Sequence, residues 1–135
     1  MRAVLDPNIL IAALLSPGGV PAQLVRRWLG GEYELVVSDA LLAELERALA
    51  YPKLRRRVTP DEAAEFVTLL RHGAILGPDP PKPAQRSADT GDDYLLALAE
   101  SERAVLVSGD QHLLALAAEL PIQPARAFLD TLASR

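Results

Sequence analysis

Short apolar runs alternate along the chain with segments of helical periodicity, and this alternation constrains the fold most strongly. Runs typical of buried strands cover 2–5, 34–37 and 104–107, with weaker ones at 74–76 and 121–123. Helical patterns cover 8–15, 21–29, 38–50, 59–72, 90–102, 110–120 and 124–133. Strands that alternate with helices favour parallel pairing, because helices supply the crossover connections. The sequence therefore predicts an α/β fold in which helices cover both faces of a mostly parallel sheet.

The composition is that of one globular domain over 1–135. The chain has 135 residues, half of them hydrophobic, which is enough for one core and short for two. It has no cysteine, which excludes disulfides, thiolate zinc sites and cysteine nucleophiles. A proline-rich segment at 77–83 is interpreted as an extended surface connection within this domain.

The start of the chain lacks the apolar region of a signal peptide, and no apolar stretch approaches the roughly 18 residues that span a bilayer. We therefore expect a cytoplasmic protein that does not contact a membrane. The formal net charge is −4. This charge argues against non-specific binding to polyanions, so a nucleic-acid partner has to be held by a local basic patch.

Two aspartates follow apolar strands. In open α/β sheets ligands bind beyond the carboxyl ends of the strands, and Asp6 and Asp110 follow the runs at 2–5 and 104–107. Each also fits a structural role, because Asp is a common helix N-cap and Pro7 suits a first helical position. Ser108 adds a hydroxyl at the same strand end, where it suits a hydrogen bond to a site residue. Both interpretations of the aspartates stay open.

A third acid is expected on a buried helix face. On a helix that begins near Gly91, Asp92 shares one face with three apolar residues, at 95, 96 and 99. A carboxylate that faces the core needs a partner, because burial of an unpaired charge is costly. The neighbouring Asp93 points about 100° away and is interpreted as a first-turn acid that the helix dipole favours.

The helix at 38–50 offers a fourth acid. Glu44 and Glu46 flank its apolar face on opposite sides, so periodicity does not choose between them. Carboxylates that converge at one place repel one another, and a divalent cation resolves that conflict. Mg²⁺ or Mn²⁺ takes oxygen ligands and commonly accompanies phosphate substrates. The residue inventory therefore supports metal-dependent phosphodiester hydrolysis.

Taken together, these motifs resemble the PIN domain family, in particular the small prokaryotic toxin components of toxin–antitoxin pairs. VLDPNIL resembles the family's opening aspartate motif, VVSDALLAELERAL its glutamate helix and DDYLLALAESERAVLVSGDQHLL its C-terminal signature. The resemblance implies a three-layer α/β/α sandwich with a central, mostly parallel sheet of four to five strands. It also implies a ribonuclease that uses Mg²⁺ or Mn²⁺, with Asn8 and Ser108 in support of four catalytic and metal-binding acids, Asp6, Glu44, Asp92 and Asp110.

Two positions depart from the family pattern. Pro7 stands where the family usually has a small hydroxyl residue, and Ser87 stands where an aspartate is common. Both favour an alternative in which the chain is a catalytically weak or inactive module of the same fold that binds RNA or a protein partner. A phosphoaspartate protein with Asp6 as nucleophile is a more remote alternative, because neither lysine of the chain is well placed for it.

A basic segment, YPKLRRR at 51–57, suits contacts to an RNA backbone. Its structural alternative is a solvated helix end, where basic side chains suit the dipole. The predicted RNA-binding residues are Lys53, Arg55, Arg56, Arg57 and Arg86.

The expected partners are an RNA substrate, an antitoxin protein and a second copy of the chain. The family habit and the apolar helices near Leu24, Trp28 and Phe66 favour the homodimer.

Overall fold

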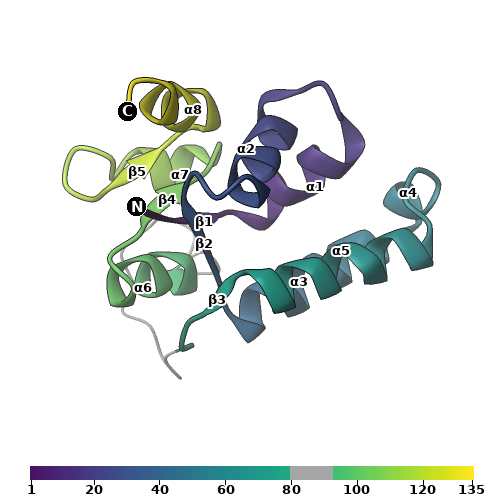
Figure 1. The fold of residues 1–135 in the computed structure, drawn as a ribbon. Helices are drawn as coiled ribbons and strands as arrows, with labels where there is room; N and C mark the ends of the chain where they lie inside the picture. Colours follow the sequence, from purple (N-terminus) through teal and green to yellow (C-terminus); the bar gives the residue numbers. More distant parts are fainter. Residues whose placement is uncertain (80–92) are drawn as a thin grey trace.

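A computed structural model describes residues 1–79 and 93–135 as a parallel sheet with helices on both sides (Figure 1). The strand order is β3-β2-β1-β4-β5. All the pairings between these strands are parallel, so the predicted parallel α/β architecture is confirmed. The strands are β1 (Arg2–Leu5), β2 (Glu34–Val37), β3 (Ile75–Leu76), β4 (Val105–Val107) and β5 (Ile122–Gln123).

The helices form two outer layers. In Figure 1, α2 and α8 lie above the sheet and α6 lies below it. The helix α1 packs against α2 and α3, α2 against α8, α3 against α5, and α6 against β1 and β4. The helices are α1 (Pro7–Leu15), α2 (Val20–Leu29), α3 (Asp39–Leu49), α4 (Pro52–Arg55), α5 (Pro60–Gly73), α6 (Asp93–Ser101), α7 (Gln111–Leu114) and α8 (Ala125–Ala133).

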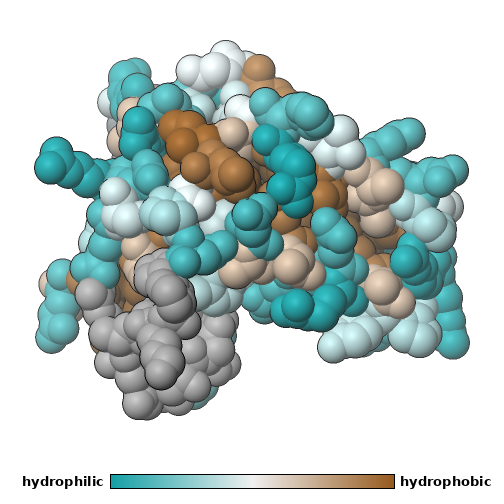
Figure 2. Space-filling model, turned by 90° about the horizontal axis from the view of Figure 1, so that it is seen from below, coloured by the Kyte–Doolittle hydropathy of each residue, from teal (hydrophilic) through white to brown (hydrophobic). Residues whose placement is uncertain are grey.

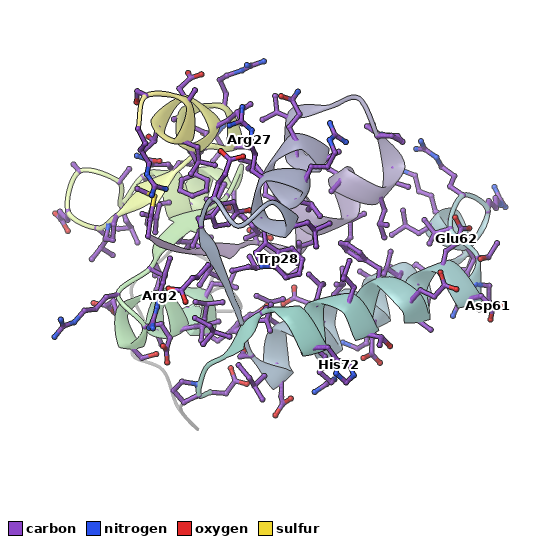
Figure 3. All side chains as sticks on the ribbon, in the orientation of Figure 1. Arg2, Arg27, Trp28, Asp61, Glu62 and His72 are labelled. Carbon is purple, nitrogen blue, oxygen red and sulfur yellow. The ribbon has the colours of Figure 1, made fainter. Side chains whose placement is uncertain are left out.

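Local signals fix the starts of α3 and α5. The Ser38 hydroxyl accepts a hydrogen bond from the Leu41 backbone N–H, which caps α3. Thr59 and Glu62 form a reciprocal capping box at the start of α5, and Pro60 occupies its first position. These caps satisfy N–H groups that the first turn of a helix leaves without partners. This start of α5, with Asp61 and Glu62, lies next to α4 in Figure 3.

Two segments differ from the sequence prediction. The segment at 110–120 is α-helical only over Gln111–Leu114 and then continues as turns. Beyond Leu113 its apolar side chains are only partly buried, so little packing stabilises further helical turns. The basic segment, which none of the predicted helical patterns covers, contains the short helix α4. The predicted helix start near Gly91 lies outside the described residues.

The core is mainly aliphatic and includes the three residues around which we expected homodimer helices. Leu24, Trp28 and Phe66 are all buried. Trp28 projects from α2 toward α5 (Figure 3), where a Cβ added to Gly73 would lie 3.0 Å from its ring. These residues therefore stabilise the fold itself and do not form a free surface for a second copy.

Some apolar side chains do reach the surface. Figure 2 shows one face of the molecule, on which apolar residues gather in the middle and hydrophilic residues surround them. The large hydrophobic residues with substantial exposure in the described ranges are Met1, Leu29, Tyr51, Leu69 and Leu76. No single helix within 1–79 and 93–135 has the length and apolar character to cross a membrane, although α1 and α2 together meet those two criteria as a bent pair.

Candidate active site

Buried polar side chains gather at the carboxyl edge of the sheet. In the part of the chain that the structure describes, they are Asp6, Ser38, Asp93 and Ser108. Three of them directly follow β1, β2 and β4, which are neighbours in the sheet. Asp93 opens α6, and the other end of α6 leads through a short turn into the amino end of β4, so the helix start lies at the same edge. Burial of polar groups is costly, so their concentration at one edge indicates a functional site.

This edge includes the switch point of the fold. From β1 the chain proceeds to β2 and β3 on one side of the sheet, and it later forms β4 and β5 on the other side. The connections that leave β1 and β4 therefore diverge, and such a divergence is where open α/β sheets bind ligands. Asp6 and Ser108 are the first residues after these two strands.

Asp6 is both a helix cap and a buried site carboxylate. Asp6 is only 4% exposed, and its Oδ1 accepts a hydrogen bond of 2.9 Å from the Asn8 backbone N–H. Oδ2 accepts a hydrogen bond of 2.8 Å from the Ser108 hydroxyl. Asn8 is exposed, and it supports Asp6 through its backbone N–H. The sequence prediction gave Asn8 a supporting role but did not say whether its backbone or its side chain would act. The two interpretations of Asp6 are therefore compatible.

Other carboxylates act on Asp6. Burial raises the pKa of Asp6 above its ordinary value of 3.8, while the hydrogen bonds from Asn8 and Ser108 lower it. The negative charges of Glu44 and Asp110 raise the pKa of Asp6 further. These two acids come from α3 and from the residue before α7, so the fold brings three distant carboxylates into electrostatic contact. A cation at this place would relieve their repulsion.

Ser108 connects Asp6 to Asp110. Its hydroxyl oxygen accepts a hydrogen bond of 3.0 Å from the Asp110 backbone N–H while it donates to Asp6. Asp110 is the N-cap of α7, and its Oδ1 accepts hydrogen bonds from the backbone N–H groups of His112 and Leu113. One buried hydroxyl thus fixes the positions of both loops at the switch point.

The two glutamates of α3 differ in their surroundings. Glu44 is half-buried, and its Oε2 accepts a hydrogen bond from the Tyr94 hydroxyl. Glu46 is exposed and lines a groove of about 510 Å³ between α3 and α5, together with Arg55 and Arg71. The structure therefore places Glu44, and not Glu46, beside Asp6, a distinction that helical periodicity could not make.

Asp93 corrects the interpretation of α6. We expected it to point away from the core, but it is 3% exposed. The buried residues of α6 also include Leu95, Leu96, Leu98 and Ala99. When a helix is buried on more than one side, the apolar residues of a single side do not show which acid faces inward. Asp92 itself lies outside the described residues. The width of the apolar face, which includes Leu98, was the signal that could have identified Asp93.

The basic segment lies at some distance from the acids. Lys53, Arg55, Arg56 and Arg57 are exposed on or after α4, and Arg86 lies outside the described residues. The Arg57 guanidinium donates to the Leu15 carbonyl at 3.2 Å, so α4 lies beside the C-terminal end of α1. Asp6 caps the opposite end of this helix of 9 residues. The basic segment and Asp6 are therefore roughly 14 Å apart along α1.

The donor chemistry of the acids suits a hard cation, although their side chains are not arranged around one position. Carboxylate and hydroxyl oxygens are the ligands that Mg²⁺ and Mn²⁺ prefer. Within 1–79 and 93–135, no group of three or more Asp, Glu or His side chains is placed to hold a metal ion.

Comparison with known proteins agrees with this architecture. A family model described as the PIN domain matches residues 2–112. The chain belongs to the PIN domain family. An uncharacterised protein of Methanocaldococcus jannaschii, MJ1680, is similar to this PIN domain, with 24% identity over 118 residues that cover 86% of this chain and 75% of the relative.

Two solved structures share the fold of this PIN domain. PAE2754 from Pyrobaculum aerophilum aligns with a TM-score of 0.69 and 21% identity over 100% of this chain and 91% of that chain. VapBC-1 from nontypeable Haemophilus influenzae aligns with a TM-score of 0.61 and 19% identity over 93% of this chain and 99% of that chain. At these identities the likeness extends to the fold alone.

Proposed function

We propose that this PIN domain is an endoribonuclease that hydrolyses RNA phosphodiester bonds with Mg²⁺ or Mn²⁺. PIN domains are generally nucleases, and the family is shown by the match over residues 2–112. One observation of the site carries the proposal to this chain. Asp6 is buried at the switch point of the sheet, bound by Ser108 and under the charges of Glu44 and Asp110.

Asp6, Glu44 and Asp110 would hold the cation together with an acid at the start of α6. The sequence prediction names Asp92 for that last role, and the burial of Asp93 makes it the second candidate. The cation would supply an activated water and neutralise charge on the phosphodiester. Ser108 orients the Asp6 carboxylate and fixes the Asp110 backbone, and the N–H groups of His112 and Leu113 hold the Asp110 carboxylate.

Cleavage assays test this proposal and separate the two candidates on α6. We expect D6N to lower the cleavage rate of a single-stranded RNA by about 100-fold or more. Mutation of a residue that hydrogen-bonds a metal ligand already lowers activity about 10- to 100-fold, and loss of the ligand itself should lower it further. EDTA should abolish cleavage, and added Mn²⁺ should restore it. A loss in D93N that D92N does not share would assign the role to Asp93. Equal cleavage by the wild type, D6N and EDTA-treated protein would show that the activity comes from elsewhere.

The alternative is a module of this fold that binds RNA or a protein partner with weak or no catalysis. It is favoured by the absence of a ready metal cluster in the described residues. The departure at Pro7 agrees with it, and Ser87 lies outside the described residues. A melting temperature that millimolar Mn²⁺ leaves unchanged would support this alternative over the nuclease.

We also propose that this PIN domain is the toxin of a toxin–antitoxin pair, with an antitoxin protein as its partner. The motif resemblance and the fold shared with VapBC-1 support this role. Expression of the wild type in a bacterial host should arrest growth, and expression of D6N should not. Arrest by both proteins would show that toxicity does not depend on the acidic site.

The proposed homodimer needs an apolar surface other than Leu24, Trp28 and Phe66, which are buried. The exposed leucines Leu29 and Leu69 are available for it. Light scattering measures the mass of the purified chain in solution. A monomer mass at micromolar concentration would exclude a stable homodimer.

A further inference from the structure

Tyr94 makes a contact at the acidic site that the residue roles described so far leave unused. It lies in the first turn of α6, directly after the buried Asp93, and its hydroxyl donates a hydrogen bond to Oε2 of Glu44 on α3. The two residues are separated by 50 positions in sequence. The contact therefore links the two helices that bring acids to the site from opposite sides of β1.

The environment of the pair favours one fixed arrangement. Tyr94 is half-buried, and its ring packs against the hydrophobic core, which restricts the rotation of the side chain. Glu44 is also half-buried, and its negative charge is close enough to affect Asp6. A phenol that donates to a carboxylate forms a charge-assisted hydrogen bond, which is stronger than one between neutral groups.

We propose that Tyr94 is a positioning residue that holds the Glu44 carboxylate at the acidic site. The phenol occupies Oε2, so Glu44 offers its other oxygen, Oε1, to a cation or a bound water. Without the phenol, the flexible Glu44 side chain loses its fixed orientation toward Asp6. This inference rests on the proposed metal-dependent function, and it assigns Tyr94 no direct contact with substrate.

The first test examines the contact without metal. Protein labelled with 3-fluorotyrosine has three ¹⁹F signals, because the chain contains three tyrosines. The signal that disappears in Y94F belongs to Tyr94. We expect E44Q to shift that signal, because it replaces a charged acceptor by a neutral one, and to leave the other two in place. An unchanged Tyr94 signal in E44Q would overturn the proposal.

The second test measures Mn²⁺ binding by calorimetry in the wild type, Y94F, E44Q and the double variant. Loss of a partner that orients a ligand costs about 10- to 100-fold in metal affinity, and we expect a loss of that size in Y94F. The double variant should bind Mn²⁺ no more weakly than E44Q alone, because Tyr94 acts through Glu44. A purely structural role of Tyr94 would instead add a separate loss in the double variant.

Y51F is the matched control, since Tyr51 is the most exposed of the large hydrophobic residues and lies at the start of α4. Like Y94F, it removes a tyrosine hydroxyl, but at a position away from the acids, and it should leave Mn²⁺ affinity unchanged. If the wild type binds no Mn²⁺, the proposed metal-dependent function fails and the role of Tyr94 fails with it. If E44Q weakens binding and Y94F does not, or if the losses add, only the role of Tyr94 is overturned.

Discussion

At the scale of single residues, Asp6 carries opposing demands. Its carboxylate caps α1 and receives the Ser108 hydroxyl, and both contacts favour the charged form. Burial and the neighbouring acids oppose that form, and the net result is a raised pKa. Asp6 is therefore a position where the fold accepts a destabilised charge.

D6N should be more stable relative to the wild type at neutral pH than in acid. The folded wild type retains a proton on Asp6 that the unfolded chain releases as the pH rises above 3.8. Its stability consequently decreases over the range between 3.8 and the raised pKa, and an asparagine does not titrate. Asparagine also keeps the helix cap. Melting temperatures without metal across this range measure the difference between the two proteins, and a difference independent of pH would contradict the prediction.

S108A should destabilise the fold by about 1–3 kcal/mol, because it leaves a buried carboxylate and a backbone N–H each with one hydrogen bond fewer. Urea denaturation at neutral pH measures the loss. S101A is the control, since the one bond of the Ser101 hydroxyl to the described residues is to a carbonyl within its own helix, α6. We expect S101A to change stability by less than about 0.5 kcal/mol. Equal effects of the two substitutions would show that Ser108 has no special role at the switch point.

At the scale of elements, the capping box of α5 is a local feature with a measurable effect. T59A should cost about 1 kcal/mol, because the Glu62 N–H loses its acceptor at the start of the helix. T68A makes the same substitution at an exposed position within α5 and should be neutral or slightly stabilising. Denaturation curves of both variants test this, and a larger loss in T68A would contradict it.

Elements that depend on local signals could be predicted from the sequence, and those that depend on packing could not. Ser38 and Thr59 cap α3 and α5 as their residue types predict. The helix α7 ends at Leu114 because the later apolar residues find little to pack against. Asp93 is buried because α6 is covered on more than one side, which no single helical stripe reveals.

Asp6 and Asp110 could be named from strand ends, but their contacts could not, and the buried Asp93 was misread. Strand ends indicated Asp6, Ser108 and Asp110. The bond between Ser108 and Asp6 depends on the pairing of β1 with β4, which no local pattern specifies. The link from Tyr94 to Glu44 depends in the same way on how α6 and α3 are placed around β1.

At the scale of the whole molecule, charge is distributed unevenly. The chain carries a net charge of −4, yet four basic residues are exposed around α4. The contact of Arg57 with Leu15 places the basic segment at the C-terminal end of α1, and Asp6 of the acidic site caps the other end. An RNA that reaches the acids could therefore contact the basic segment at the same time.

R56Q should weaken the binding of single-stranded RNA and lower the slope of log affinity against log salt by about 0.7, the value for one phosphate contact. R103Q is the matched control, because Arg103 is also exposed but lies in the turn before β4, at the opposite edge of the sheet. Fluorescence anisotropy at several salt concentrations measures both variants. Equal slopes for R56Q and R103Q would show that the segment around α4 does not bind the RNA backbone.

The parallel pairing of β1 with β4 also determines when the candidate site is completed during synthesis. The hydroxyl partner of the Asp6 carboxylate, Ser108, is synthesised 102 residues later. Until β4 has emerged from the ribosome, β1 remains an edge strand. A polypeptide still in synthesis therefore carries its first acid without the rest of the site. The topology thus delays assembly of the candidate site until most of the protein has been made.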